Sequence, residues 1–266
     1  MSTCFNGLYC IHLELTSRCN KDCWMCGRRK IDNEYPDIAM NYGDMAFDLV
    51  KKIVGQLPER TLVQFHNNGE PLLYPRLGEV LKLFEGQIRS LNTNGKLIVD
   101  KAEQIIDNLE TITLSVIEND TEGDDQYELI KKFIAIKGRK KPLVIYRIMG
   151  DVDIARWKKL DGIIATRILH NPMGSFKYKK TPTIPEVGIC LEILSHMAIN
   201  RFGEVSICVR FDPKALGVIG DAKLTPLVDI WNGSKRKEWV EYHLAGDRDK
   251  IPLCSYCDFW GVPTGS

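Results

Sequence analysis

The chain has 266 residues, of which 27% are charged and 44% are hydrophobic, and its net charge is +1. This length suits one large domain, or one domain with a small extension, and the composition is ordinary for a globular protein. A net charge near zero gives no basic surface for nucleic acid and no acidic tail. No apolar run approaches the roughly 18 residues of a membrane helix, so we expect neither nucleic acid nor a membrane as a partner.

The N-terminal sequence, Met-Ser-Thr-Cys-Phe-Asn-Gly, lacks the charged and apolar segments of a secretory signal. The chain nevertheless has nine cysteines. Without a secretion signal, cysteines favour metal or redox chemistry over disulfides. We therefore expect a cytoplasmic protein that holds metal.

Apolar β-type runs alternate with amphipathic helical runs through much of the chain. The sequence predicts strands at about 8–15, 61–66, 88–92, 111–117, 143–148 and 163–169. It predicts helices at about 43–56, 76–85, 97–108, 124–137 and 151–159. Because each of the first five strands is followed by a helix, the pattern indicates parallel βα units of an α/β fold. The periodicity fits either a partial (β/α)6 barrel or an open doubly wound sheet.

The first predicted strand leads directly into three closely spaced cysteines. Cys19, Cys23 and Cys26 have the spacing Cys-x3-Cys-x2-Cys. Three thiolates on one loop can hold three irons of a [4Fe–4S] cluster and leave the fourth iron open, as a catalytic metal site requires. Zinc is the alternative, but it needs four ligands, and the next histidine, His66, lies in another element. The spacing favours the iron–sulfur cluster.

Polar residues also follow or end the other predicted strands. Parallel α/β folds bind ligands at the carboxyl ends of their strands, so these residues should converge on the rim that carries the cysteine loop. In chain order they are His66 to Pro71, Asn92 to Gly95, Ser115 to Glu118, Tyr146 with Arg147, and His170 to Gly174.

The pattern changes after residue 175. A Lys/Thr/Pro-rich stretch at 176–185 predicts a linker, residues 197–208 predict a hairpin that turns at 202–204, and a helix is predicted at about 226–245. Four thiolates in this region can complete a fully ligated [4Fe–4S] cluster, with a structural zinc site as the alternative. These four residues are Cys190, Cys208, Cys254 and Cys257.

The early cysteine motif and the sequence Asn68-Gly69-Glu70-Pro71 together resemble the radical S-adenosylmethionine (radical SAM) superfamily. The later cysteines resemble its SPASM/twitch subfamily. Met25 stands where the superfamily usually has an aromatic residue, and Asn68 replaces the first glycine of a Gly-Gly-Glu motif. The resemblance implies a partial (β/α)6 radical SAM barrel in residues 1–175 and a small C-terminal twitch domain in residues 176–266. It also implies two [4Fe–4S] clusters, with S-adenosylmethionine (SAM) on the open iron of the first.

The resemblance further implies which residues contact SAM. Glu70 would hold the amino group, a glycine would let the backbone approach the ligand, and Ser115 would lie near the ribose. Arg147 would contact the SAM carboxylate or the substrate, or else form an ion pair with a neighbouring carboxylate. His170 is a candidate acid or base, or else an ordinary loop residue. The predicted cofactor-binding residues are Met25, Asn68, Gly69, Glu70, Thr93, Asn94, Ser115 and Arg147.

The spacing of the later cysteines resembles the 2-deoxy-scyllo-inosamine dehydrogenase type of radical SAM enzyme. This type implies reductive cleavage of SAM, abstraction of a substrate hydrogen by the 5′-deoxyadenosyl radical, and an auxiliary cluster that accepts an electron. The substrate would be small and polar, and a flavodoxin or ferredoxin would donate electrons. Two alternatives stay open: a radical SAM enzyme that epimerises or crosslinks a peptide, and a non-catalytic zinc or iron–sulfur binding module.

Overall fold

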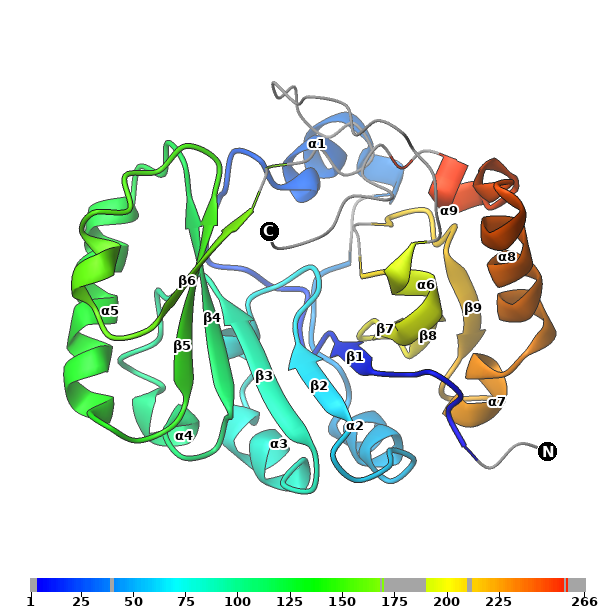
Figure 1. Ribbon diagram of the computed structural model, residues 1–266, viewed down its shortest axis with the longest axis horizontal. Helices are drawn as coiled ribbons and strands as arrows, with labels where there is room; N and C mark the ends of the chain where they lie inside the picture. Colours follow the sequence, from blue (N-terminus) through cyan, green and yellow to red (C-terminus); the bar gives the residue numbers. More distant parts are fainter. Residues whose placement is uncertain are drawn as a thin grey trace.

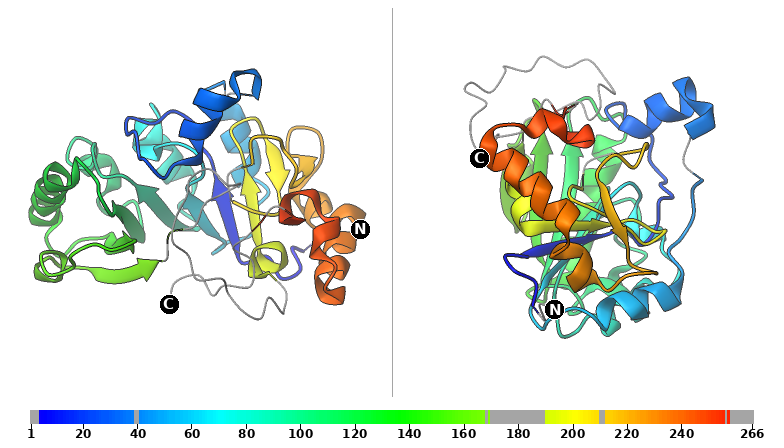
Figure 2. Two further views of the ribbon diagram at one scale, coloured as in Figure 1. Left: turned by 90° about the horizontal axis from the view of Figure 1, so that it is seen from above. Right: turned by 90° about the vertical axis from the view of Figure 1, so that its right-hand side faces the viewer.

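The computed structural model describes residues 4–38, 41–167, 169, 190–209, 212–255 and 257. Their strands form one sheet with the order β6-β5-β4-β3-β2-β1-β7-β8-β9 (Figure 1). Seen from above in Figure 2, the strands follow a curve, with α5 on one flank and α8 on the other. Within these residues, none of the helices has the length and apolar character needed to span a membrane.

The predicted series of six parallel strands is confirmed, because β1 to β6 pair in parallel in sequence order. The predicted hairpin is also confirmed, since β7 and β8 pair antiparallel on either side of its turn. The strands are β1 (Cys10–Leu13), β2 (Leu62–Phe65), β3 (Ile88–Thr93), β4 (Thr111–Ile117), β5 (Leu143–Met149), β6 (Ile163–Arg167), β7 (His196–Ile199), β8 (Glu204–Ser206) and β9 (Val218–Asp221).

The helix predicted at 124–137 is confirmed as α5, and the other predicted helices are shorter than expected. The helices are α1 (Gly27–Glu34), α2 (Phe47–Val54), α3 (Leu77–Leu83), α4 (Ala102–Ile105), α5 (Gly123–Lys137), α6 (Leu191–Ser195), α7 (Leu227–Trp231), α8 (Ser234–Ala245) and α9 (Pro252–Ser255). Short 3-10 turns are η1 (Pro36–Ile38), η2 (Pro71–Leu73), η3 (Trp157–Lys159) and η5 (Arg248–Lys250).

Two helix predictions need correction. The helix expected at 151–159 is reduced to η3, because the Asp153 carboxylate accepts a hydrogen bond from the backbone N–H of Ala155 and favours a turn there. The helix expected at 226–245 breaks into α7 and α8 at Gly233. The backbone of Gly233 is extended, and a Cβ at this position would lie 3.0 Å from the carbonyl oxygen of Asp229.

The two faces of the sheet differ in polarity because alternate residues of a strand point to opposite sides. One face is apolar and carries buried side chains such as Ile11, Val63 and Leu114. Helices α3, α4 and α5 pack on the core at this side of the sheet (Figure 1). The other face carries a group of polar residues in register across neighbouring strands, so this part of the sheet can line a binding site. These polar residues include His12, Gln64, Asn92, Ser115 and Arg147.

Strand β7 extends the core sheet, because it pairs in parallel with β1 on the side opposite β2. The predicted linker at 176–185 lies outside the described residues. The division into residues 1–175 and 176–266 therefore stays a prediction. What the structure adds is that the C-terminal strands belong to the same sheet as the first six.

Candidate cofactor and cluster sites

The cysteine loop follows β1 and ends at Cys26, where α1 begins beyond the carboxyl ends of the strands (Figure 1). The backbone N–H of Cys26 donates to the carbonyl oxygen of Cys23 at 3.0 Å, which closes a turn between these two residues. Burial, and then the nearby Cys26 and Cys19, raise the pKa of the Cys23 thiol to about 12. No disulfide links the described cysteines. Three grouped thiols suit a metal, which binds them as thiolates.

A buried ion pair fixes the cysteine loop to the segment after β4. The Nζ atom of Lys21 lies 2.5 Å from Oδ2 of Asp120, and these side chains are only 3% and 9% exposed. The indole N–H of Trp24 donates to the carbonyl oxygen of Glu118 at 2.9 Å. A cavity of about 160 Å³ lies at this junction. The loop therefore has a defined position at the end of β4.

The turn after β2 lies directly against the chain that enters the cysteine loop. The backbone N–H of Glu70 donates to the carbonyl oxygen of Arg18 at 2.8 Å. A Cβ at Gly69 would lie 2.1 Å from the carbonyl oxygen of Thr16, so only glycine fits there. The predicted close approach of backbone at Gly69 is thus made to the protein itself. Contact between Gly69 and SAM stays a prediction.

The Glu70 carboxylate joins the turn after β2 to the end of β3. It is 2% exposed and accepts hydrogen bonds from the Leu72 N–H at 3.0 Å, the Thr93 hydroxyl at 2.7 Å and the Asn94 N–H at 2.8 Å. Burial raises the pKa of Glu70 to about 7, against the opposing effect of these hydrogen bonds. Glu70 therefore positions Thr93 and Asn94, and its predicted contact with the SAM amino group is untested.

Asn94 connects β3 to the cysteine loop. Its side-chain amide donates to Asn20 Oδ1 at 2.9 Å and lies 3.9 Å from the sulfur of Cys19. The Gln126 side chain donates to the carbonyl oxygens of Asn94 at 2.7 Å and Ser115 at 2.9 Å. Asn94 and Ser115, both predicted to contact SAM, are thus held together by one glutamine that the sequence reasoning missed.

Asn68 is held by a buried acid that the sequence reasoning also missed. Its side-chain amide donates to Oε2 of Glu14 at 2.8 Å. Burial raises the pKa of Glu14, although its hydrogen bond with Asn68 opposes the shift. An acidic residue between Leu13 and Leu15 is the same signal, a charge inside an apolar run, that singled out Arg147.

The remaining predicted residues are only partly placed. Arg147 lies on the polar face, paired with Ser115 across β4 and β5. Burial, and then Arg167, lower the pKa of Arg147 to about 10. Ion pairing with a carboxylate was the alternative for Arg147, and in the described part of the chain no carboxylate forms an ion pair with it. Met25 is half-buried in the cysteine loop, and His170 lies outside the described residues.

The later cysteines gather around a small second core. Cys190, Cys208 and Cys254 pack against a cluster that contains Ile193 and Trp239. Burial, and then the neighbouring Cys190 and Cys257, raise the pKa of the Cys254 thiol to about 12.

The short segment that carries the last two cysteines is also fixed by hydrogen bonds. The Arg248 guanidinium donates to the carbonyl oxygens of Cys254 at 2.6 Å and Cys257 at 3.1 Å. The N–H of Cys257 donates to the Cys254 carbonyl at 3.1 Å. The four cysteines predicted as a ligand set are thus brought to one region of the fold.

Comparison with known proteins agrees with the fold of the whole chain and with a cluster-binding C-terminal region. Residues 190–258 match the SPASM family, an iron-sulfur cluster-binding domain. The structure of BtrN in complex with AdoMet and 2-DOIA superposes with a TM-score of 0.64 at 20% identity, covering 94% of this chain and 93% of that one. SuiB from Streptococcus suis, bound to its precursor peptide SuiA, superposes with a TM-score of 0.58 at 15% identity, covering 95% of this chain and 71% of that one. The fold is that of the radical SAM enzymes with a SPASM domain.

A curated relative is the tungsten-containing aldehyde ferredoxin oxidoreductase cofactor-modifying protein of Pyrococcus furiosus. It is 33% identical over 96 residues, which are 34% of this chain and 25% of that protein. The chain thus spans about a quarter of the length of this relative. The match supports the family resemblance and leaves the activity of the whole protein to be proposed.

A polar cavity of about 50 Å³ lies between the SPASM domain and the turn after β2. Asn67 and Asn68 line it from the turn, and Cys208 and Asp212 line it from the SPASM domain. This cavity therefore lies between Cys208 of the later cysteine set and the turn after β2.

Proposed function

We propose that this protein is a radical SAM enzyme that binds two [4Fe–4S] clusters and SAM and oxidises a small polar substrate. The observation that carries the proposal is the contact of Asn94 with the Cys19 region, because it joins the predicted SAM-binding rim to a three-cysteine loop. When bound, the first cluster and SAM would supply one-electron cleavage of SAM and abstraction of a substrate hydrogen.

The residues of the chain would hold and orient these groups. Cys19, Cys23 and Cys26 would bind the first cluster, and the Lys21–Asp120 ion pair would keep their loop in place. Glu70 would keep the Thr93–Asn94 turn in position beside it. Ser115 would contact the ribose of SAM from the polar face of β4.

The SPASM domain would hold the second cluster through Cys190, Cys208, Cys254 and Cys257. Four thiolates leave no open iron, so this cluster suits electron transfer better than substrate binding. The match to BtrN over nearly its full length supports a small polar substrate, since BtrN was captured with AdoMet and 2-DOIA. The match to SuiB, which was captured with a precursor peptide, supports a peptide as the second candidate.

The polar face of the sheet would bind the substrate, with Arg147 as a candidate contact. A flavodoxin or ferredoxin would supply the electron, and the protein would act in the cytoplasm. These partners follow from the family resemblance.

Metal analysis tests the proposal. Protein purified without oxygen should contain about eight irons per chain, corresponding to two [4Fe–4S] clusters. Candidate cyclitols and peptides labelled with deuterium should then be incubated with the protein, SAM and a reductant. Deuterium in the 5′-deoxyadenosine product identifies the substrate class. Zinc in place of iron in both cysteine sets would support the binding-module alternative and contradict the enzyme.

A further inference from the structure

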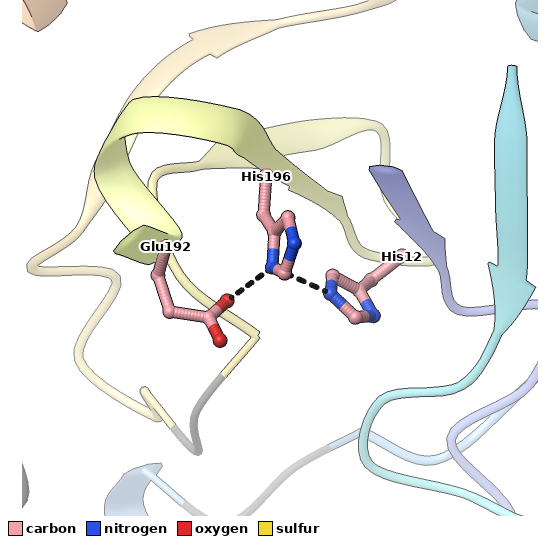
Figure 3. A group of neighbouring side chains, drawn as sticks. All are labelled: His12, Glu192 and His196. Carbon is pink, nitrogen blue, oxygen red and sulfur yellow. Dashed lines mark hydrogen bonds and ion pairs between the residues drawn. The ribbon is translucent and has the colours of Figure 1, made fainter. Parts of the chain in front are cut away.

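Three side chains outside both cysteine sets point toward one another from three different elements (Figure 3). They are His12 of β1, His196 of β7 and Glu192 of α6, and one ligand atom from each lies within 4.8 Å of the others. We propose that His12, His196 and Glu192 bind one zinc ion. The site shares no ligand with either predicted cluster and does not depend on the proposed enzymatic function.

The spacing of the three side chains fits a small tetrahedral ion. Nε2 of His12 lies 3.5 Å from Nδ1 of His196, which in turn lies 3.0 Å from Oε2 of Glu192. Nitrogen and oxygen ligands at about 2.0–2.1 Å from zinc are about 3.3 Å apart at the tetrahedral angle. These two separations lie on either side of this value, and the third, between the ligand atoms of His12 and Glu192, is within 4.8 Å, so the side chains are near the positions that a bound ion requires.

The fold places these residues together for identifiable reasons. His196 pairs with Cys10 across β1 and β7, and His12 lies two residues further along the same face of β1. Glu192 lies one helical turn before His196, so its carboxylate reaches the same ring. The sulfur of Cys10 is 4.0 Å from Nε2 of His12 and is within reach as a fourth ligand.

Nδ1 of His196 cannot form hydrogen bonds with both of its neighbours, His12 and Glu192, at the same time. If Nδ1 of His196 carries a proton and donates it to Glu192, no hydrogen of His196 points at Nε2 of His12. If instead Nε2 of His12 donates to Nδ1 of His196, then a bare nitrogen faces the Glu192 carboxylate at 3.0 Å. A cation accepts the lone pairs of all three atoms at once.

The site is buried on one side and accessible on the other. His12 is 5% exposed, whereas the side chains of His196 and Glu192 are 25% and 16% exposed. Zinc can therefore enter past His196 and Glu192 and meet His12 at the inner wall. One carboxylate and two imidazoles, with a position left for Cys10 or water, form a ligand set typical of zinc.

Zinc binding should be measured on protein in which the iron–sulfur clusters are intact. The protein, reconstituted without oxygen, is incubated with a small excess of Zn²⁺ and desalted, and zinc and iron are then counted by mass spectrometry. We expect about one zinc per chain, with X-ray absorption showing mainly nitrogen and oxygen ligands at about 2.0 Å. Glu192→Gln and His196→Ala should each weaken zinc binding at least tenfold without changing the iron content.

Glu241→Gln is the matched control, because Glu241 is an exposed residue of α8 and the substitution removes the same charge. It should bind zinc as the unmodified protein does. The proposal is overturned if the unmodified protein retains no zinc, or if the ligands are mainly sulfur at about 2.3 Å, which would place zinc in the cysteine sites. Unchanged zinc binding in both Glu192→Gln and His196→Ala would also overturn it.

Discussion

The backbone N–H of Glu70 donates to the carbonyl oxygen of Arg18 at 2.8 Å, while the Glu70 carboxylate accepts the N–H of Asn94 at 2.8 Å. One residue thus joins the turn after β2 to the cysteine loop after β1 and to the end of β3. The position of the cysteine loop therefore depends on contacts far from the cysteines in sequence.

Replacing Gly69 tests the contact between the turn and the loop. In Gly69→Ala the new methyl group would overlap the backbone oxygens of Thr16 and Arg18, which lie 2.1 and 2.8 Å from the Cβ position. Overpacking of this kind costs about 1–3 kcal/mol, and we expect a lower unfolding temperature and weaker SAM binding. Gly86→Ala is the control, because no atom lies within 4 Å of its Cβ position. Equal behaviour of the two variants would contradict this role of Gly69.

The ion pair between Lys21 and Asp120 should stabilise the cysteine loop. Among the described residues, Asp120→Asn leaves the buried ammonium group of Lys21 with Glu122 as its one carboxylate partner, at 3.6 Å. Breaking a buried pair in this way costs about 3 kcal/mol, so the variant should unfold more easily and lose iron from the first cluster faster. Glu128→Gln removes an exposed pair with Lys131 and should change neither property measurably. Iron loss at the same rate in both variants would exclude the anchoring role.

Glu70 should also make stability depend on pH. Its pKa is raised from 4.5 to about 7 in the folded protein, so the folded state holds the proton more tightly than the unfolded state. The resulting stabilisation is complete below the unfolded pKa and is lost as pH rises through 7. Relative to Glu70→Gln, the free energy of unfolding of the wild type should fall by on the order of 3 kcal/mol as pH rises from below the unfolded pKa to above the folded pKa. Unfolding temperatures at about pH 5 and about pH 7.5 measure it, and a constant difference between the proteins would contradict the shift.

The sequence predicted the six parallel strands because their apolar residues alternate or cluster between helical runs. It did not predict α1, since Gly27–Glu34 is mostly polar and lacks an apolar stripe, Ile31 being its one buried hydrophobic side chain. The pairing of β7 with β1 was also missed, because local periodicity carries no information on which distant strands meet.

The same limit applies to the candidate site. The motif around Glu70 could be identified from its residues. The hydrogen bonds that Thr93 and Asn94 donate to the Glu70 carboxylate could not, because they depend on how β2 and β3 pack. Glu14 could have been identified from the sequence, because it is a charged residue within an apolar run, as Arg147 is.

The cysteines of the SPASM domain should be separable from the first cluster. Replacing Cys190, Cys208, Cys254 and Cys257 by Ala should lower iron from about eight to about four per chain and stop product formation. SAM cleavage should persist at least in part, because it needs only the first cluster. The thermal stability of the C-terminal region should also fall, because a small cluster-binding domain depends on its metal for folding. Complete loss of SAM cleavage with the first cluster still present would contradict this division.

Formation of 5′-deoxyadenosine is the measurement that tests the central claim most directly. The anaerobically reconstituted protein, given SAM and a strong reductant, should produce 5′-deoxyadenosine and methionine. The variant with Cys19, Cys23 and Cys26 replaced by Ala should hold about four fewer irons and produce neither compound. The absence of 5′-deoxyadenosine from the iron-loaded protein, or undiminished formation by the triple variant, would contradict the account.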